Sequence, residues 1–136
     1  MARAETLALI QRYYEAFNAG DTAGMLACIT DDIEHRVNEG AHRLGKELFT
    51  EFCSHMGVSY RETLKDMVFF ANDAGDRAAA EFVVHGEYLK TDPGLPEAKG
   101  QRYILPAGGF FDIRGDKIAR ITTFYNLNDW VAQVSK

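Results

Sequence analysis

A histidine, a carboxylate and two tyrosines near the start of the chain could together carry acid–base chemistry. His35 and Glu39 lie in a segment with strand character, and Tyr13 and Tyr14 lie in one with helical periodicity. A helix, a Gly-Asp corner, a short helix and a strand follow one another between residues 10 and 40. This order would bring the four side chains together beneath one apolar layer. The sequence therefore predicts a pocket that contains acid–base groups.

Strand alternation decides which side chains share a face with His35. Successive side chains point to opposite faces, so His35, Val37 and Glu39 lie on one side if the strand over residues 32–38 stays regular. If that side faces a pocket, His35 can act as a general base and Glu39 can orient or assist it. A second interpretation needs no catalysis, because His35 could simply bond a tyrosine while Glu39 is solvated. The sequence leaves both open.

The turn-forming residues 38–40 admit two roles as well. Asn and Gly favour turns, and Asn38 could also hydrogen-bond a carbonyl group at the mouth of a pocket. Tyr13 and Tyr14 have the spacing of core aromatics, yet a buried tyrosine hydroxyl needs a polar partner. We expect His35 or a ligand to supply that partner.

Apolar periodicity predicts a first helix over residues 3–18. Tyr13 should lie at the edge of its buried face, because the i, i+3 and i+7 rhythm runs through other positions. That face is formed by Leu7, Ile10, Tyr14 and Phe17.

The remaining pattern predicts an α+β layout, in which helices precede consecutive strands. Gly20 suits the left-handed end of the first helix, and Asp21 suits the N-cap of a second. A third helix should bury Leu48 and Phe49. The expected elements are helices over residues 22–29 and 45–56, strands over 32–38, 61–72, 77–90, 101–114 and 117–127, and a loop with two prolines over 91–100.

Length, charge and motifs limit the classes of partner. The 136 residues fit one domain, and the net charge of −5 argues against nucleic acid and anionic membranes as partners. We expect a cytoplasmic protein, because no apolar run could span a bilayer, no secretion signal is recognisable and the isolated Cys28 and Cys53 suit a reducing compartment. We expect no metal, because the histidines lack paired ligand spacing, and no nucleotide cofactor, because glycine-rich phosphate motifs are missing.

Several motifs together resemble the nuclear transport factor 2-like superfamily. They read RYYEAFNAGD, TDD and GGFFDIRGDKIARITTFYN, and the loop GLPEAKGQ resembles SnoaL-like polyketide cyclases of that superfamily. The chain as a whole is most similar to ketosteroid isomerase-related proteins. The resemblance implies a single SnoaL-like domain over residues 1–136, with a cone-shaped, curved antiparallel sheet wrapped around three N-terminal helices, a cystatin-like fold with an internal cavity.

The ketosteroid isomerases themselves provide a residue-by-residue comparison. They use a helix tyrosine, an aspartate base and a protonated second aspartate. The motif Q-R-Y puts Tyr13 in the place of the tyrosine, whereas the base position falls on Val37 and the second aspartate position on Gly108. Two of the three catalytic groups are missing, which argues against steroid isomerisation by that mechanism.

The resemblance also implies which strand faces line the cavity. In the strand over residues 77–90 the apolar side chains should face inward, and Glu81, His85 and Glu87 should face outward, where such domains form homodimers. The wall suits a small hydrophobic or amphipathic molecule. The expected substrate-binding residues are Tyr14, Phe17, Asn38, Phe82, Val84, Phe110, Ile121, Thr123 and Tyr125.

Two functions fit this pattern. The first is a cofactor-independent enzyme that isomerises, cyclises, hydrates or dehydrates a small apolar molecule, with His35 as base or acid, Tyr13 as oxyanion donor and Glu39 as a positioning group. The second is a non-catalytic module that binds a small ligand or another protein. In an enzyme, these three side chains should converge on one accessible void.

Overall fold

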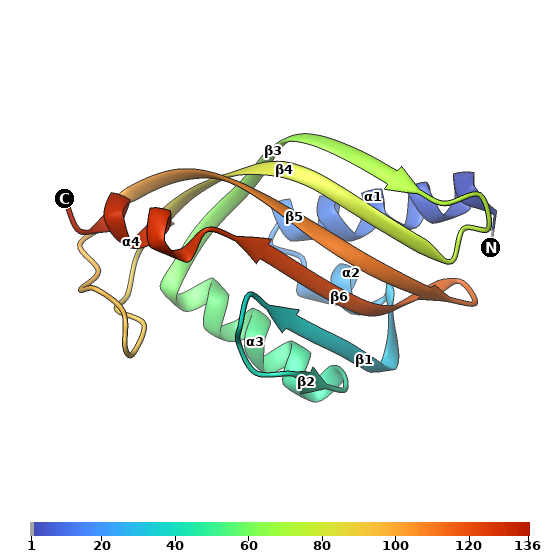
Figure 1. The fold of residues 1–136 in the computed structure, drawn as a ribbon. Coiled ribbons are helices and arrows are strands. Elements are labelled where there is room, and N and C mark those ends of the chain that lie inside the picture. The colour runs from blue at the N-terminus through green and yellow to red at the C-terminus, as the bar shows by residue number, and fades with distance from the viewer. Residues whose placement is uncertain (1) are drawn as a thin grey trace.

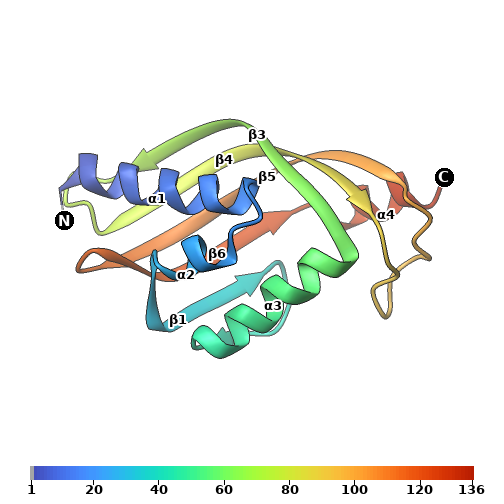
Figure 2. The ribbon, with the colours of Figure 1, turned by 180° about the vertical axis from the view of Figure 1, so that it is seen from behind.

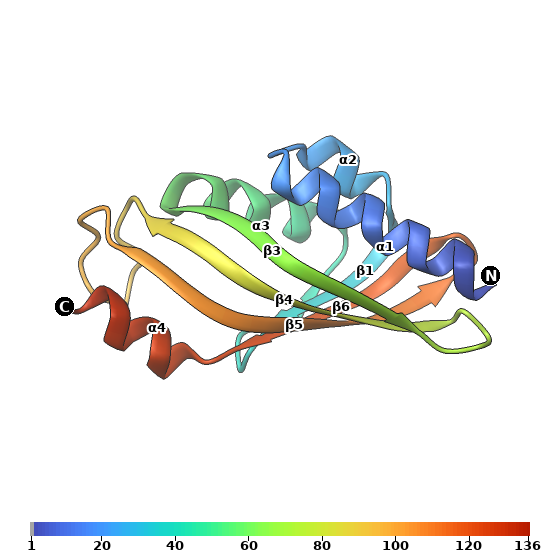
Figure 3. The ribbon, with the colours of Figure 1, turned by 90° about the horizontal axis from the view of Figure 1, so that it is seen from above.

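Three helices from the first half of the chain lie on one side of a six-stranded sheet (Figures 1 and 3). The computed structural model describes residues 2–136. The elements are α1 (Arg3–Asn18), α2 (Thr22–Leu26), β1 (Ile29–Val37), β2 (Arg43–Leu44), α3 (Lys46–Ser59), β3 (Tyr60–Ala71), β4 (Arg77–Tyr88), β5 (Arg102–Arg114), β6 (Lys117–Tyr125) and α4 (Leu127–Val134). The predicted α+β fold is confirmed. No helix in the described range is long and apolar enough to cross a membrane.

The strand order in the sheet is β2-β1-β6-β5-β4-β3. The hairpin partners run antiparallel, but β1 runs parallel to β6, so the prediction of a wholly antiparallel sheet is wrong at this pair. The two strands come from opposite ends of the chain, and neither carries a local signal that names its neighbour. Figure 2 shows α1 running along the sheet and α3 lying beside β1.

The start of the connection between α1 and β1 has the conformation that was predicted for Gly20 and Asp21. Gly20 has a φ of +69°, and the Asp21 carboxylate accepts a hydrogen bond of 2.9 Å from the backbone N–H of Gly24. The helix α2 is shorter than the predicted range 22–29. The backbone carbonyl of Cys28 accepts from Ile118 N–H at 2.8 Å, so sheet pairing with β6 replaces helical bonding there.

The buried face of α1 is rotated from the predicted one. Tyr13 and Tyr14 are both buried, whereas Leu7 and Phe17 are only half-buried. The rings of Tyr13 and Tyr14 meet edge to face with centroids 5.1 Å apart, and both contact Phe111 on β5. Tyr13 is therefore at the centre of the packed face rather than at its edge.

The helix α3 also packs differently from the prediction on one side. Phe49 is buried as expected, but Leu48 is 44% exposed. The helix extends to Ser59, beyond the predicted end at residue 56.

The fourth helix, α4, was not predicted. The strand β6 ends at Tyr125, and the side-chain oxygen of Asn126 accepts a 3.0 Å hydrogen bond from Asp129 N–H as the N-cap of α4. Trp130 of α4 packs edge-on against Tyr88 and Tyr103. The C-terminal segment thus forms part of the aromatic core instead of continuing the strand.

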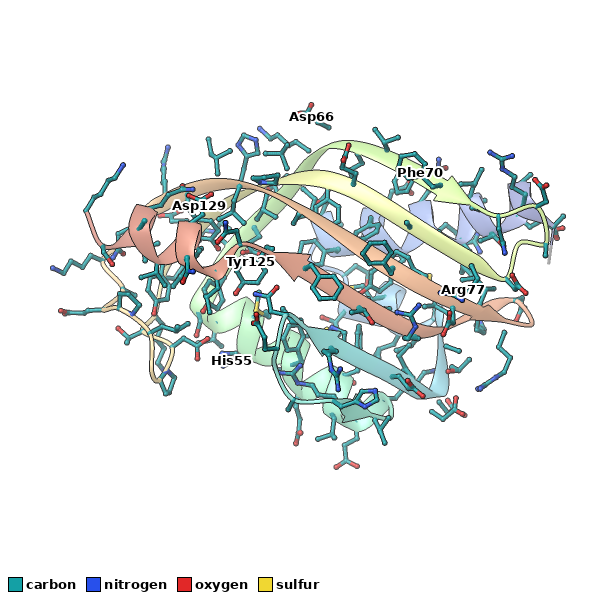
Figure 4. The ribbon with its side chains drawn as sticks, in the orientation of Figure 1. His55, Asp66, Phe70, Arg77, Tyr125 and Asp129 are labelled. Carbon is teal, nitrogen blue, oxygen red and sulfur yellow. The ribbon has the colours of Figure 1, made fainter. Side chains whose placement is uncertain are left out.

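A bulge in β3 bends the sheet and changes which side chains face inward. Asp66 has a φ of +55°, and the pairing with β4 shifts between Lys65 and Val68. Leu64 is buried before the bend, whereas Phe69 packs on the core after it and Phe70 is exposed. Figure 4 labels Asp66 at this bend and Phe70 beyond it.

The outer face of the sheet carries large apolar side chains that are about half exposed. They come from three strands and accompany the outward groups of β4. A face of this kind marks an interaction surface. It contains Val68, Phe70, Ile104, Phe110 and Phe124.

We expect two copies of the chain to associate through this outer face. Light scattering at micromolar concentration should then give twice the 15.2 kDa mass of one chain. Ile104 is 57% exposed at this face, and Ile104→Glu should give a monomer, because an unpaired charge would be buried in the contact. Leu48→Glu, on the opposite side of the molecule, should leave the dimer intact. A monomeric mass for the unmodified protein would contradict the expectation.

Candidate functional site

A cavity of about 790 Å³ lies between α1, α3 and the inward face of the sheet. This volume suits a small organic ligand. A second hollow, of about 740 Å³, lies between α1, α2 and the turn before β6, and contains none of the predicted site residues. The predicted residues that line the first cavity are Tyr13, Tyr14, Phe17, His35, Phe82, Val84, Thr123 and Tyr125.

His35 points inward from β1 and is only 4% exposed. Its ring meets Phe49 and Phe52 of α3 edge-on, with centroids 5.1 and 4.6 Å away. Burial, and next the nearby Arg43 charge, lower the pKa of His35 from 6.5 to about 4. The ring is therefore neutral at pH 7, with a proton on one nitrogen and a lone pair on the other.

The predicted hydrogen bond from His35 to a tyrosine does not involve the Nδ1 atom. That atom has no hydrogen-bond partner among residues 2–136. Burial raises the pKa of both Tyr13 and Tyr14, so both phenols keep their protons and remain potential donors. A Cβ atom at Gly109 would lie 2.7 Å from the Tyr14 hydroxyl oxygen, so the glycine leaves room for that group.

Glu39 and Asn38 are not in the cavity wall. The strand β1 ends at Val37 and Asn38 has a φ of +50°, so strand alternation stops before Glu39, which is exposed. The Asn38 side-chain oxygen accepts from Tyr125 N–H at 2.9 Å, which ties the turn to β6. The predicted inward positions of these two residues are therefore corrected, and the turn interpretation of residues 38–40 holds for Asn38.

Phe110 and Ile121 are also placed differently from the prediction. In the β5–β6 hairpin Phe111, not Phe110, lies opposite Ile121. Phe110 consequently faces outward and is 47% exposed, whereas Ile121 is buried in the core outside the cavity lining. Ala107 has the same strand phase as Phe111 and lines the cavity. Gly108, one residue further along, therefore does not have an inward position.

A carboxyl group that the sequence analysis missed lies in the cavity wall. Glu62 of β3 is half-buried, and the Tyr103 hydroxyl donates a 2.5 Å hydrogen bond to its Oε2 atom. Burial raises the pKa of Glu62, and the bond from Tyr103 opposes this shift. The pKa of Tyr103 is raised by its burial and by the Glu62 charge, so its hydroxyl stays a donor.

Gly86 makes this pair possible. Glu62, Gly86 and Tyr103 are direct neighbours on β3, β4 and β5. The Tyr103 ring crosses over Gly86, where a Cβ atom would collide with it. Glu62 has the same strand phase as the buried Leu64 and lies opposite Gly86. This combination is the sequence signal that could have identified Glu62.

The loop after β4 contributes to the cavity wall. Asp92 and Leu95 of this loop line the cavity. The Asp92 carboxylate accepts a 2.7 Å hydrogen bond from the Tyr60 hydroxyl and lies 3.1 Å from His55 Nε2. Figure 4 shows His55 on α3, below Tyr125 at the end of β6. The loop is thus fastened to α3 and β3.

A family model described as "SnoaL-like domain" matches residues 10–121. Three solved bacterial structures, each described as a "putative polyketide cyclase", are similar over nearly the whole length. The protein of Silicibacter sp. TM1040 is 56% identical with a TM-score of 0.96, covering 100% of this chain and 99% of that one. The protein of Xanthomonas campestris is 51% identical with a TM-score of 0.94, covering 97% of this chain and 98% of that one. The protein of Pseudomonas putida is 53% identical with a TM-score of 0.94, covering 95% of this chain and 97% of that one.

A more distant structure, a phenazine biosynthesis-related protein of Pseudomonas aeruginosa, shares the fold. It is 19% identical with a TM-score of 0.82, covering 98% of this chain and 82% of that one. No curated protein matches the sequence.

The neutral state of His35 predicts a specific pH dependence of stability. The folded protein binds the His35 proton more weakly than the unfolded chain, so this contribution is complete above pH 6.5 and is lost as the pH falls to about 4. The loss for one buried group is about 3 kcal/mol. In urea unfolding, His35→Gln should therefore lose less stability over this window than the unmodified protein. His85→Gln, on the outer face, should lose as much as the unmodified protein; identical curves for all three would refute the burial argument.

The contact between Gly86 and Tyr103 predicts the effect of one added methyl group. Gly86→Ala should displace the Tyr103 ring and break its bond to Glu62, which costs about 1–3 kcal/mol for overpacking. Gly57→Ala is the matched control, because its Cβ would meet no atom of the described chain within 4 Å and alanine favours helix α3. A Gly86→Ala protein as stable as the original in urea would show that the ring moves freely.

Proposed function

The chain belongs to the SnoaL-like family, and we propose that it is a cofactor-independent enzyme that moves protons within a small, mainly apolar molecule held in the cavity. Relatives more than half identical carry the description "putative polyketide cyclase", which favours a ring-closing step or a related isomerisation or dehydration. Ring closure at a carbonyl requires a base for the proton that leaves carbon and donors for the oxyanion that develops.

One arrangement carries the proposal: His35 and Glu62 line the same cavity, and burial there shifts their pKa values in opposite directions. His35 is held proton-free on one nitrogen, whereas Glu62 is protonated more readily than an ordinary carboxyl group. Groups separated in this way are suited to the complementary roles of base and acid. His35 would accept the proton, and Glu62, bonded by Tyr103, would return one.

The tyrosines of α1 complete the proposed machinery. Tyr13 and Tyr14 line the cavity with phenols whose raised pKa keeps them protonated, so either can donate to an oxyanion. Glu39 has no part in this arrangement, because it lies outside the lining. Two of the three groups first expected to converge, His35 and Tyr13, therefore share the void.

The second candidate is a binding module without chemistry. It is favoured by the aromatic side chains of the wall, among them Phe49, Phe52, Phe82 and Trp130. In that case the cavity would hold an unreactive ligand and His35 would only shape it. Turnover separates the two candidates, whereas binding alone does not.

The test is turnover of a panel of polyketide fragments, terpenoids and steroids. Once a substrate is found, Glu62→Gln and His35→Gln should each lower kcat by about 10²–10⁴-fold, the usual effect of removing a general acid or base. Melting temperatures should stay within a few degrees of the original. Glu51→Gln and His42→Gln, both exposed, are the controls. Tight binding of panel members with no turnover of any of them would favour the binding module.

A further inference from the structure

Arg43 is a cationic side chain in the wall of the cavity, next to His35. The two-residue strand β2 pairs with β1 so that Arg43 lies directly opposite His35, and paired residues project to the same face. The Arg43 guanidinium carbon lies 4.5 Å from the centre of the Phe52 ring, which also contacts His35. Phe52 thus contacts both the Arg43 guanidinium and the His35 imidazole.

Each of these groups has a buried polar atom that no described residue satisfies. Arg43 Nη1 and His35 Nδ1 are both buried and lack a hydrogen-bond partner in the part of the chain that the structure describes. Arg43 also forms no salt bridge there, whereas Arg61, which lines the same cavity, lies 3.5 Å from Glu87. Unpaired polar groups in a dry site are costly unless something else pairs with them.

The carboxyl groups of the cavity wall are already engaged elsewhere. Glu62 accepts the hydrogen bond from Tyr103, and Asp92 accepts from Tyr60 and lies beside His55. Neither carboxyl group forms a salt bridge with Arg43 among the described residues.

We infer that Arg43 and His35 form a subsite for a carboxylate group on an otherwise apolar ligand. Guanidinium groups match carboxylates in geometry, and such charge-assisted bonds are strong where water is excluded. The neutral His35 ring can donate its single N–H to the same carboxylate. Phe49 and Phe52 flank the subsite and suit a ligand whose carboxylate is attached to an aromatic or hydrocarbon skeleton. The inference rests on the proposed function only in placing the substrate in this cavity.

The test compares 2-naphthoate with the uncharged, nearly isosteric 2-naphthamide by isothermal titration calorimetry at pH 7. The unmodified protein should bind the acid at least about tenfold more tightly than the amide, the value of a modest charge-assisted bond. Arg43→Met keeps an unbranched apolar stem but removes the guanidinium and its charge, and should abolish this preference. Arg36→Met, at an exposed position of the neighbouring strand, should retain it. Equal binding of the two probes by the unmodified protein, no binding of naphthoate at millimolar concentration, or a preference that survives Arg43→Met would each overturn the inference.

A second measurement does not depend on the folding of a variant. A carboxylate beside His35 should raise the pKa of that ring, followed by NMR in the unmodified protein, whereas naphthamide should not. An unchanged His35 pKa in the naphthoate complex would also overturn the subsite. These readouts are independent of turnover: if Glu62→Gln kept full activity, the catalytic proposal would fail while the naphthoate preference could still stand.

Discussion

The burial of Tyr13 and Tyr14 between α1 and the sheet is the constraint on which the cavity depends. The Tyr14 ring lies 5.3 Å from Phe82 and 5.9 Å from Phe111, and aromatic pairs of this kind contribute about 0.5–1.5 kcal/mol each beyond their buried area. The helix is also fastened near both ends: Thr6 donates to the Gly75 carbonyl at 2.5 Å, and the Asn18 side chain bonds both backbone groups of Leu64. These contacts fix α1 against the sheet, and its two tyrosines form part of the cavity wall.

The same apolar wall that keeps this space open also sets the chemistry of the groups inside it. Low polarity disfavours the charged form of every titratable group, so it lowers the pKa of His35 and raises that of Glu62. A single cause therefore shifts the pKa values of the two groups in opposite directions, and the proposed proton transfer depends on that difference. The backbone supports this at Gly86, because only a residue without a side chain lets Tyr103 reach Glu62 across the intervening strand.

Local signals in the sequence were sufficient for much of this structure. The bounds of α1, the cap at Asp21 and the hairpin turns depend on residues close together in the chain, and they are where the sequence indicated. Strand alternation also puts His35 on the same face as Val37, and both line the cavity. Features that depend on distant partners could not be predicted. Asn38 ends the alternation of β1 by accepting a hydrogen bond from β6. The pairing of β5 with β4 and β6 determines which of its residues face inward, and it places Phe110 outside the cavity.

The missed strand β2 shows why sequence patterns find some site residues and not others. Two residues have no periodicity to detect, so Arg43 could be placed beside His35 only by its pairing with β1. This placement changes the chemical environment of His35. Burial alone already favours the neutral form of His35, and the neighbouring Arg43 charge adds to this effect. With Arg43 beside it, His35 becomes half of the proposed donor pair. The balance of charges then determines what the cavity accepts. Glu62, Asp92 and Arg61 each bond another side chain of the protein, whereas Arg43 has no carboxylate partner in the described chain, and an acidic ligand would supply one.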